Sequence, residues 1–438
     1  MDGIGKVDII ARNTIKPSSP TPDHLRIFKL SLLDQIIPPM YGLIVFFYPA
    51  ETGTNFSEQS SRLRESLSRT LTTFYPMAGR TNAIEPSIDC SDDGAFFVEA
   101  KMDCELSDFL RKPDGELLNN FLPTTDPLTA QLSEGYVTLI QITGFRCGGT
   151  AVSVCISHKI GDISSLVTFL HGWTSSGEAG SPVFVGDSLL PPRDLSFAQR
   201  TDIKSGNLIT KRFVFEASKI SHLKDKVGAI DHNIQMINKY PSRVEVVMAQ
   251  IFKCAIAASR SVTGSFKTSV LFHSVNLRPR TDPPLPENSV GNLIWFVPVV
   301  IEESEMDLRT MVHKMKRLVN EFCNEKAKKF KDHSLSVLGE FGKWAEFKEM
   351  EFYSCSSWCK FPLYETDFGW GKPIWVSSAN LTFKNSIILV DTREGDGIEA
   401  WVTLEEEKMA IFERDNELLD SATFNPSAYL YITSTQSV

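Results

Sequence analysis

Apolar positions in the first half of the chain follow both strand-like and helix-like spacing. Residues 42–49 (GLIVFFYP) form a continuous apolar run of strand length, and residues 136–145 and 150–157 form two more around an Arg-Cys-Gly-Gly turn. Within residues 63–74, leucines and a phenylalanine recur every three or four positions, as on one face of a helix. The Asp-Asp-Gly sequence within residues 83–102 predicts the turn of a β-hairpin.

The second half shows the same mixture of patterns. Strands are predicted at 211–216, 268–277, 293–300 and within 374–404. Helices are predicted at 217–228, 242–259, 307–332 and 405–422. Because both halves mix strands with helices, the expected fold class is α/β, with two mixed domains of similar size.

A polar stretch separates the two halves. Residues 174–210 are rich in Gly, Ser, Pro and charged side chains, a composition typical of an interdomain linker. We therefore predict an N-terminal domain over 1–190, a crossover linker over approximately 191–210 and a C-terminal domain over 211–438. A chain of 438 residues is long enough for two such domains.

Composition narrows the class of partner. Hydrophobic residues make up 42% and charged residues 23% of the chain, as in a soluble globular protein. A net charge of −9 argues against nucleic acid or an anionic membrane as the main partner. The apolar stretch at 41–50 is too short to span a bilayer, and the N-terminus has no apolar signal region. A cytoplasmic protein that acts on a small molecule is expected.

The cysteines indicate neither a disulfide framework nor a metal site. All eight are scattered along the chain. Cys355 and Cys359 are four residues apart, but no second pair of Cys or His lies nearby at metal-ligand spacing. We expect free thiols in a reducing compartment and no bound metal.

The candidate chemistry begins at His158, which stands where the strand at 150–157 ends. Asp162 follows four residues later, at the start of a helix-like stretch. A neutral histidine at a strand end can remove a proton from a hydroxyl group, which contributes roughly 10²–10⁴-fold to a rate. Asp162 either orients the imidazole or locks the turn through an N-cap or an ion pair. A purely structural histidine is the alternative, because this spacing often occurs by chance.

The sequence Asp367–Pro373 (DFGWGKP) carries a second motif. With His-x-x-x-Asp before it in the chain, it resembles the two signatures of the plant BAHD acyltransferases, which transfer acyl groups from coenzyme A thioesters. Further landmarks, such as FYPMAGR and VNLRPRTDPPLPENSVGN, extend the resemblance over nearly the whole chain. Within the family, the sequence resembles the branch that contains vinorine synthase and salutaridinol acetyltransferase, enzymes that acetylate hydroxyls of polycyclic alkaloids.

The resemblance implies a fold and several roles. Two similar mixed α/β domains of the chloramphenicol-acetyltransferase-like type are expected, with an active-site channel between them. His158 corresponds to the family's general base. Asp162 corresponds to an aspartate that pairs with an arginine, here Arg278. The loop that supports coenzyme A binding and the fold corresponds to Asp367, Phe368, Gly369, Trp370 and Gly371. A catalytic Asp367 is the alternative interpretation.

The sequence does not decide which groups contact the oxyanion or the phosphates of coenzyme A. A tetrahedral oxyanion needs a donor about 3 Å away, and the candidates are Asn292, the Trp370 indole or a backbone N–H. Lys253, Lys360 and Arg393 are candidates for the phosphates of coenzyme A. The alternative interpretation is that each of these three residues is an ordinary surface charge or is paired with an acidic side chain.

The implied activity is acyl-CoA-dependent O-acylation, with acetyl-CoA as co-substrate and no bound cofactor. The expected acceptor is a hydroxyl of a polycyclic alkaloid or terpenoid, or a sugar hydroxyl of a glycoside. Leu33, Ile36, Ile37 and Met40 either line an apolar acceptor pocket or belong to the core. The alternatives are N-acylation, a malonyl or aromatic donor, and a non-catalytic scaffold on the same fold. A monomer is expected.

Overall fold

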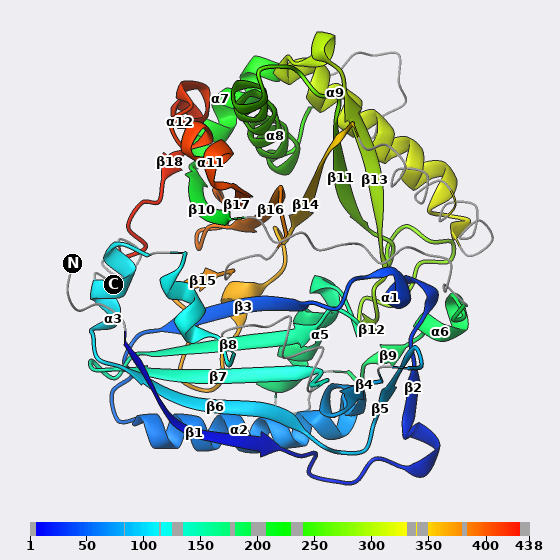
Figure 1. Cartoon of the computed structure of the whole chain (residues 1–438). Helices are drawn as coiled ribbons and strands as arrows, with labels where there is room; N and C mark the ends of the chain where they lie inside the picture. Colours follow the sequence, from blue (N-terminus) through cyan, green and yellow to red (C-terminus); the bar gives the residue numbers. More distant parts are fainter. Residues whose placement is uncertain are drawn as a thin grey trace.

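The computed structural model contains two large β-sheets, each packed against helices (Figure 1). The residues that it describes are 6–82, 84–113, 115–124, 135–175, 180–193, 207–228, 240–330, 339, 349–378 and 383–429.

The first sheet is built almost entirely from the first half of the chain. Its strand order is β1 (Val7–Ile15), β6 (Ala95–Met102), β7 (Thr138–Phe145), β8 (Thr150–Ser157), β3 (Tyr41–Tyr48) and β15 (Trp375–Ser377). Neighbouring strands are antiparallel, except that β6 and β7 are parallel. The helices α2 (Phe56–Thr73), α3 (Leu106–Arg111) and α5 (Ile163–Thr174) contribute buried side chains to the same core.

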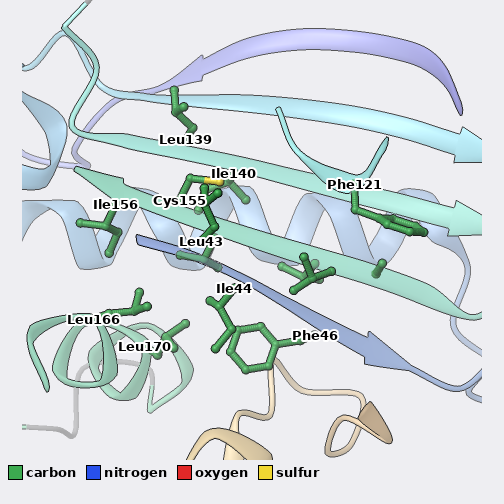
Figure 2. Packing of buried hydrophobic residues seen from close by; sticks show 14 of the residues in the cluster. Leu43, Ile44, Phe46, Phe121, Leu139, Ile140, Cys155, Ile156, Leu166 and Leu170 are labelled. Carbon is green, nitrogen blue, oxygen red and sulfur yellow. The ribbon is translucent and has the colours of Figure 1, made fainter. Parts of the chain in front are cut away.

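The hydrophobic pattern explains why these elements form. Figure 2 shows Leu43, Ile44 and Phe46 of β3 beside residues of β7 and β8, with Leu166 and Leu170 of α5 in the same core. The apolar stripe predicted within 63–74 lies on α2 and on its C-cap residue, Phe74, and is buried. A capping box begins this helix, because the Asn55 side chain accepts the Glu58 N–H and the Glu58 side chain accepts the Asn55 N–H.

The predicted hairpin within 83–102 is wrong. Strand β5 (Ser87–Asp89) belongs to a separate three-stranded sheet with β2 (Ile27–Lys29) and β4 (Arg80–Thr81), whereas β6 pairs with β1 and β7. The turn between them is held by distant partners. The carboxylate of Asp92 accepts hydrogen bonds from Thr21 and Arg26, so the chain passes from one sheet to the other instead of folding back.

The second sheet comes from the second half of the chain. Its order is β13 (Ile294–Ile301), β11 (Ser269–Asn276), β14 (Glu351–Ser357), β16 (Ser386–Asp391), β17 (Ile398–Glu405), β10 (Leu208–Phe215) and β18 (Thr423–Phe424). Strands β11, β14 and β16 are parallel to one another. Their carboxyl ends therefore share one edge of the sheet, the place where open α/β sheets commonly bind ligands.

Helices cover this sheet and share its core. They are α7 (Ala217–Val227), α8 (Arg243–Thr263), α9 (Leu308–Glu321), α11 (Glu406–Phe412) and α12 (Asn416–Ser421). A π-helical turn, Phe322–Lys326, continues α9. The single helix predicted over 405–422 is two helices, because Asp415 caps the second one by accepting the N–H of Leu418.

Helix α8 is long and apolar enough, by length and composition alone, to cross a membrane. However, 67% of its most apolar stretch is buried inside the protein, and its side chains form much of the second core. Core helices of this kind pass the same test, so the finding is weak evidence for a membrane span.

The two halves interlock. Strand β15 comes from the second half of the chain but pairs with β3 in the first sheet (Figure 1). Trp375 of β15 donates its indole N–H to Glu399 of β17, and Glu399 forms a buried ion pair with Arg212 of β10. Residues 194–206, most of the predicted linker, lie outside the described residues, and the domain boundaries stay a prediction.

Among the described residues, four short elements pack where the two halves of the chain meet. They are α1 (Leu32–Ile36), α6 (Gly186–Leu189), β9 (Val183–Phe184) and β12 (Ser289–Val290). Strands β9 and β12 pair in parallel, which joins the first half of the chain to the loop that precedes β13. Leu32 and Leu33 of α1 pack in a third cluster with Val275 and Trp295 of the second sheet.

Candidate functional site

His158 lies directly after β8, at the strand end predicted from the sequence. Its backbone N–H donates to the Met40 carbonyl at 2.7 Å, which fixes the residue against the start of β3. The side chain is half-buried. His158 is therefore anchored through its backbone and remains partly exposed.

The imidazole forms a hydrogen bond with Asn292, across the junction between the two halves. The distance from His158 Nδ1 to Asn292 Oδ1 is 2.8 Å. The amide of Asn292 faces the ring with its oxygen because its Nδ2 donates to Asp34 Oδ1 (2.8 Å) and to the His158 carbonyl (2.6 Å). Nδ1 of the neutral ring then carries the hydrogen, and Nε2 holds a lone pair that can accept a proton.

Asp34 holds the Asn292 amide on the side away from the His158 ring. This residue was not predicted from the sequence. Its Oδ1 also accepts the backbone N–H of Asn292 at 2.8 Å, and its Oδ2 accepts the N–H and the hydroxyl of Ser31 at 2.9 and 2.6 Å. Burial raises the pKa of Asp34, and the hydrogen bonds from Ser31 and Asn292 oppose the rise. The local signal was Ser-x-x-Asp, the capping box of α1.

Lys159 brings a positive charge to the same region. Its Nζ donates to the backbone carbonyls of Asp34 and Gln35, at 3.3 and 3.0 Å. Burial lowers the pKa of Lys159, and the negative charge of Asp34 opposes that shift.

Asp162 caps α5 and forms a buried ion pair with Arg278. Its carboxylate accepts the Ser165 N–H at 3.0 Å, and two guanidinium nitrogens of Arg278 lie at 2.7 and 3.0 Å from its oxygens. Each side chain is only 2% exposed. Arg278 also donates to the carbonyls of Ser289 and Gly291, which orders the loop before Asn292.

The turn between His158 and Asp162 leaves no room for a side chain at Gly161. A Cβ atom there would lie 2.4 Å from the Cβ of Ser165. The Ser165 hydroxyl in turn contacts Asp162 and donates to the Gly291 carbonyl, both at 3.0 Å. Close packing therefore explains the glycine in this motif.

The loop at 367–371 is organised around one carboxylate oxygen. Asp367 Oδ1 accepts the backbone N–H groups of Gly369, Trp370 and Gly371, at 2.7, 3.1 and 2.9 Å. Gly369 and Gly371 have φ angles of 101° and 94°, a region that favours glycine. The Trp370 ring is buried and packs edge-on against Tyr48 of β3 and beside Phe368.

This loop lies at the opposite end of β3 from His158. Tyr41 pairs with Ser157 at one end of the strand and Tyr48 pairs with Thr150 at the other. Because a strand advances about 3.3 Å per residue, these ends are roughly 23 Å apart. Trp370 packs at the Tyr48 end, so the prediction that its indole donates to an oxyanion beside His158 is wrong.

The prediction that Asn292 donates a hydrogen bond to the oxyanion is also wrong. Both directions of its amide NH₂ are taken by Asp34 and the His158 carbonyl, and its backbone N–H is taken by Asp34. Its oxygen faces His158. Of the predicted candidates, a backbone N–H remains.

A pocket with a volume of about 350 Å³ lies beside the 367–371 loop, not beside His158. Its walls come from α2, the end of α5 and the loop itself: Ser66, Trp173, Thr174, Asp367, Phe368 and Gly369. Within the described residues, no group of three or more His, Cys, Asp or Glu side chains is arranged to hold a metal ion.

The three candidate cations lie in two places. Lys360 and Arg393 follow β14 and β16, at the carboxyl edge that also carries Arg278 after β11. Lys360 donates its backbone N–H to Asp391 at 2.6 Å. Lys253 lies within α8 and forms an ion pair with Glu417 of α12 at 2.5 Å. It is therefore the paired charge of the alternative interpretation.

The four candidate residues for the acceptor pocket lie in different surroundings. Leu33 and Ile36 pack in the cluster between α1 and the second sheet, so they belong to the core. Ile37 is buried, whereas Met40 is half-buried and contacts His158 through its carbonyl. Met40 is thus the candidate that the structure brings next to His158.

The family profile and curated sequences show what this chain is similar to. The profile of the Transferase family matches residues 5–419. Akuammiline synthase 1 from Alstonia scholaris is 39% identical over 94% of this chain and 97% of its own length. A limonoid 7-O-acetyltransferase from Citrus sinensis is 37% identical, with 96% and 98% covered. A 17,18-epoxy-17-hydroxycur-19-ene N-malonyltransferase from Strychnos nux-vomica is 36% identical, with 95% and 91% covered.

Solved structures share the fold. Vinorine synthase superposes with a TM-score of 0.84 at 32% identity, over 97% of this chain and all of its own (100%). F. graminearum TRI101, complexed with coenzyme A and T-2 mycotoxin, superposes with a TM-score of 0.72 at 16% identity, over 91% and 99%. The second likeness shows the fold alone. The predicted α/β class, of the chloramphenicol-acetyltransferase-like type, is confirmed.

Proposed function

The chain belongs to the Transferase family, the BAHD acyltransferases, and from this premise we propose that it transfers acetyl from acetyl-CoA to a hydroxyl group of a polycyclic plant alkaloid or terpenoid. It is an acyltransferase that uses acyl-CoA and a small-molecule acceptor. The observation that carries the proposal is the His158–Asn292 hydrogen bond, which leaves Nε2 of His158 as a base.

The proposed reaction needs one base and one oxyanion donor. Nε2 of His158 removes the proton of the acceptor hydroxyl while its oxygen attacks the thioester carbonyl. The resulting tetrahedral oxyanion is stabilised by a backbone N–H. The intermediate collapses as the C–S bond breaks, and the coenzyme A thiolate takes the proton back from His158. The products are the ester and free coenzyme A, so no acyl-enzyme and no bound cofactor are required.

Other residues support this step without contacting the reacting atoms. The Asp162–Arg278 pair holds the turn after His158 and the loop before Asn292. The 367–371 loop braces β3, and its proposed role is structural support on the coenzyme A side. Lys360 and Arg393, at the carboxyl edge of the second sheet, are proposed to meet the phosphates of coenzyme A in a channel between the halves.

The identities of the acceptor and the acyl group are supported by the relatives' names. A limonoid 7-O-acetyltransferase supports an acetyl donor and a terpenoid hydroxyl, and the vinorine synthase and akuammiline synthase likenesses support the alkaloid branch. An N-malonyltransferase of nearly equal identity favours a second candidate, malonyl transfer to an amine. A sugar hydroxyl of a glycoside is a further acceptor to test.

A cytoplasmic monomer is part of the proposal. All eight cysteines are free thiols, which suits a reducing compartment. Light scattering on the purified enzyme tests the monomer, and a fluorescent fusion expressed in plant cells tests the location.

Mass spectrometry of wild-type and His158→Ala enzyme tests the reaction. Each receives acetyl-CoA or malonyl-CoA with alkaloid, terpenoid, glycoside and amine acceptors. We expect acetylated alcohol from wild type and a loss of roughly 10²–10⁴-fold in turnover for His158→Ala. Calorimetric binding of coenzyme A to both proteins is the control for folding. Malonylated amine as the main product would replace the proposal with the second candidate, and full turnover by His158→Ala would refute the base.

A further inference from the structure

We propose that Asp34 is a positioning residue for His158, acting through Asn292. Its carboxylate fixes the direction of the Asn292 amide, and the amide fixes the imidazole in the tautomer that leaves Nε2 unprotonated. This inference rests on the proposed function, because only a transferase with His158 as base needs that tautomer.

The first step is the polarity of the contacts around Asp34. Each of the four hydrogen bonds described for its side chain comes from a donor: the N–H and hydroxyl of Ser31 on Oδ2, and the N–H and Nδ2 of Asn292 on Oδ1. An ionised carboxylate accepts only, so it suits all four at once. The side chain is buried, so water does not replace a lost partner.

The second step is that the Asn292 amide has one satisfactory orientation. Its Nδ2 lies 2.8 Å from Asp34 Oδ1 and 2.6 Å from the His158 carbonyl, and both are acceptors. A flipped amide would place an oxygen against these two oxygens and its NH₂ against Nδ1 of the ring. Asn292 is fully buried, so both lost bonds would go unreplaced. The carboxylate therefore determines that Oδ1 faces His158.

The third step is the consequence for the ring. Asn292 Oδ1 accepts only, so Nδ1 at 2.8 Å must carry the hydrogen. A flipped amide would instead donate to Nδ1 and favour hydrogen on Nε2, where the acceptor hydroxyl must deliver its proton. The negative charge of Asp34 also lies one amide away from the imidazolium that forms during transfer, which favours that intermediate.

Asp34→Asn removes the charge at nearly constant shape. The new amide must turn its NH₂ either toward the two donors of Ser31 or toward the two donors of Asn292. Both choices set donor against donor, and the second releases Asn292 to flip. We expect kcat to fall roughly 10–100-fold, the size of loss found when residues that orient metal-binding histidines are changed, while KM for acetyl-CoA changes little.

Ser31→Ala is the matched control. It removes a hydroxyl from Oδ2 of the same carboxylate and leaves both Asn292 contacts on Oδ1 intact. We expect it to lower Tm but to keep kcat near the wild-type value. A fall in kcat as large as that of Asp34→Asn would mean that Asp34 acts only by stabilising α1.

Nitrogen NMR of ¹⁵N-histidine-labelled full-length enzyme tests the tautomer without any substrate. The signals of His158 are identified by their absence in His158→Ala. We expect a protonated Nδ1 in wild type and a shift toward protonated Nε2 in Asp34→Asn. Protonated Nε2 in wild type, or an unchanged ring in Asp34→Asn, would overturn the inference. Because no turnover is needed, failure of the proposed reaction would leave this test standing.

A double-mutant cycle tests the route through Asn292. If Asp34 acts by holding that amide, Asp34→Asn should have little further effect on kcat once Asn292→Ala is present. Multiplied losses in the double variant would show a separate structural role and refute the route. Circular dichroism confirms that each single and double variant is folded before its kcat is measured.

Discussion

The carboxylate of Asp162 is held by two nitrogens of Arg278, at 2.7 and 3.0 Å, although it lies only four residues after His158. The pair is buried and also holds the loop before Asn292. We predict that Arg278→Ala lowers the free energy of unfolding by about 3–5 kcal/mol, because it leaves a buried carboxylate without its partner. Urea denaturation followed by fluorescence measures the change.

Asp162→Asn should be milder, because the amide oxygen can still cap α5 at Ser165. We expect a smaller loss of stability and a modest loss of activity. A folded Asp162→Asn enzyme without any turnover would instead give Asp162 a direct part in the chemistry.

Asp367 offers a second test, through the three backbone N–H groups that converge on Oδ1. Asp367→Ala should destabilise the loop by about 1–3 kcal/mol and weaken coenzyme A binding, since those groups lose their shared acceptor. Asp367→Asn keeps a side-chain oxygen and should cost less. Hydrogen exchange of residues 367–371 and coenzyme A titration report both effects. Loss of turnover alone in Asp367→Asn, with binding and exchange unchanged, would support the catalytic alternative.

The ion pair between Glu351 and Lys408 predicts how stability depends on pH. Burial acts to raise the pKa of Glu351, but the hydrogen bonds from Lys408, Ser259 and Tyr353, together with the positive charge of Lys408, hold the pKa below the ordinary 4.5. The folded protein therefore binds this proton less readily than the unfolded chain. The pair stabilises the fold above pH 4.5, and that contribution disappears as pH falls through the lower, folded pKa.

Urea denaturation at a series of pH values from about 6 down to about 3.5 checks this prediction, because carboxylates titrate over roughly this range. Other carboxylates with lowered pKa values, such as Glu305 and Asp307, act in the same direction. The comparison is therefore between wild type and Glu351→Gln. The variant should be less stable at neutral pH, and its free energy of unfolding should fall less steeply as the pH is lowered. Parallel curves for the two proteins would contradict the assignment.

The thiols should react in a defined order. Cys147 is exposed and Cys323 is partly exposed, whereas the other six cysteines are buried. Burial raises the pKa of Cys104 to about 11 and those of Cys90 and Cys359 to about 12. Iodoacetamide labelling of the native enzyme, read by peptide mass spectrometry, should modify Cys147 first and Cys323 more slowly. Early labelling of Cys155 would mean that the first sheet opens.

Local patterns were sufficient where an element depends on its own residues. The apolar stripe within 63–74 predicted α2, and the apolar runs predicted β3, β7 and β8, because burial of one face follows directly from residue spacing. The hairpin within 83–102 failed because Thr21 and Arg26, far away in the chain, determine what the turn at Asp92 does. The last helix was predicted too long because Asp415 starts a second one.

The sequence by itself determined the family and the α/β class and singled out His158 as the candidate base, since these depend on residue types and their order along the chain. Only the tertiary structure decided which group holds the imidazole. Asp34, His158 and Asn292 come from three distant segments, and no local spacing relates Asn292 to a carboxylate 258 residues away. Hydrogen bonds act over about 3 Å in space, so partners from distant segments become visible only when the folded chain brings them together.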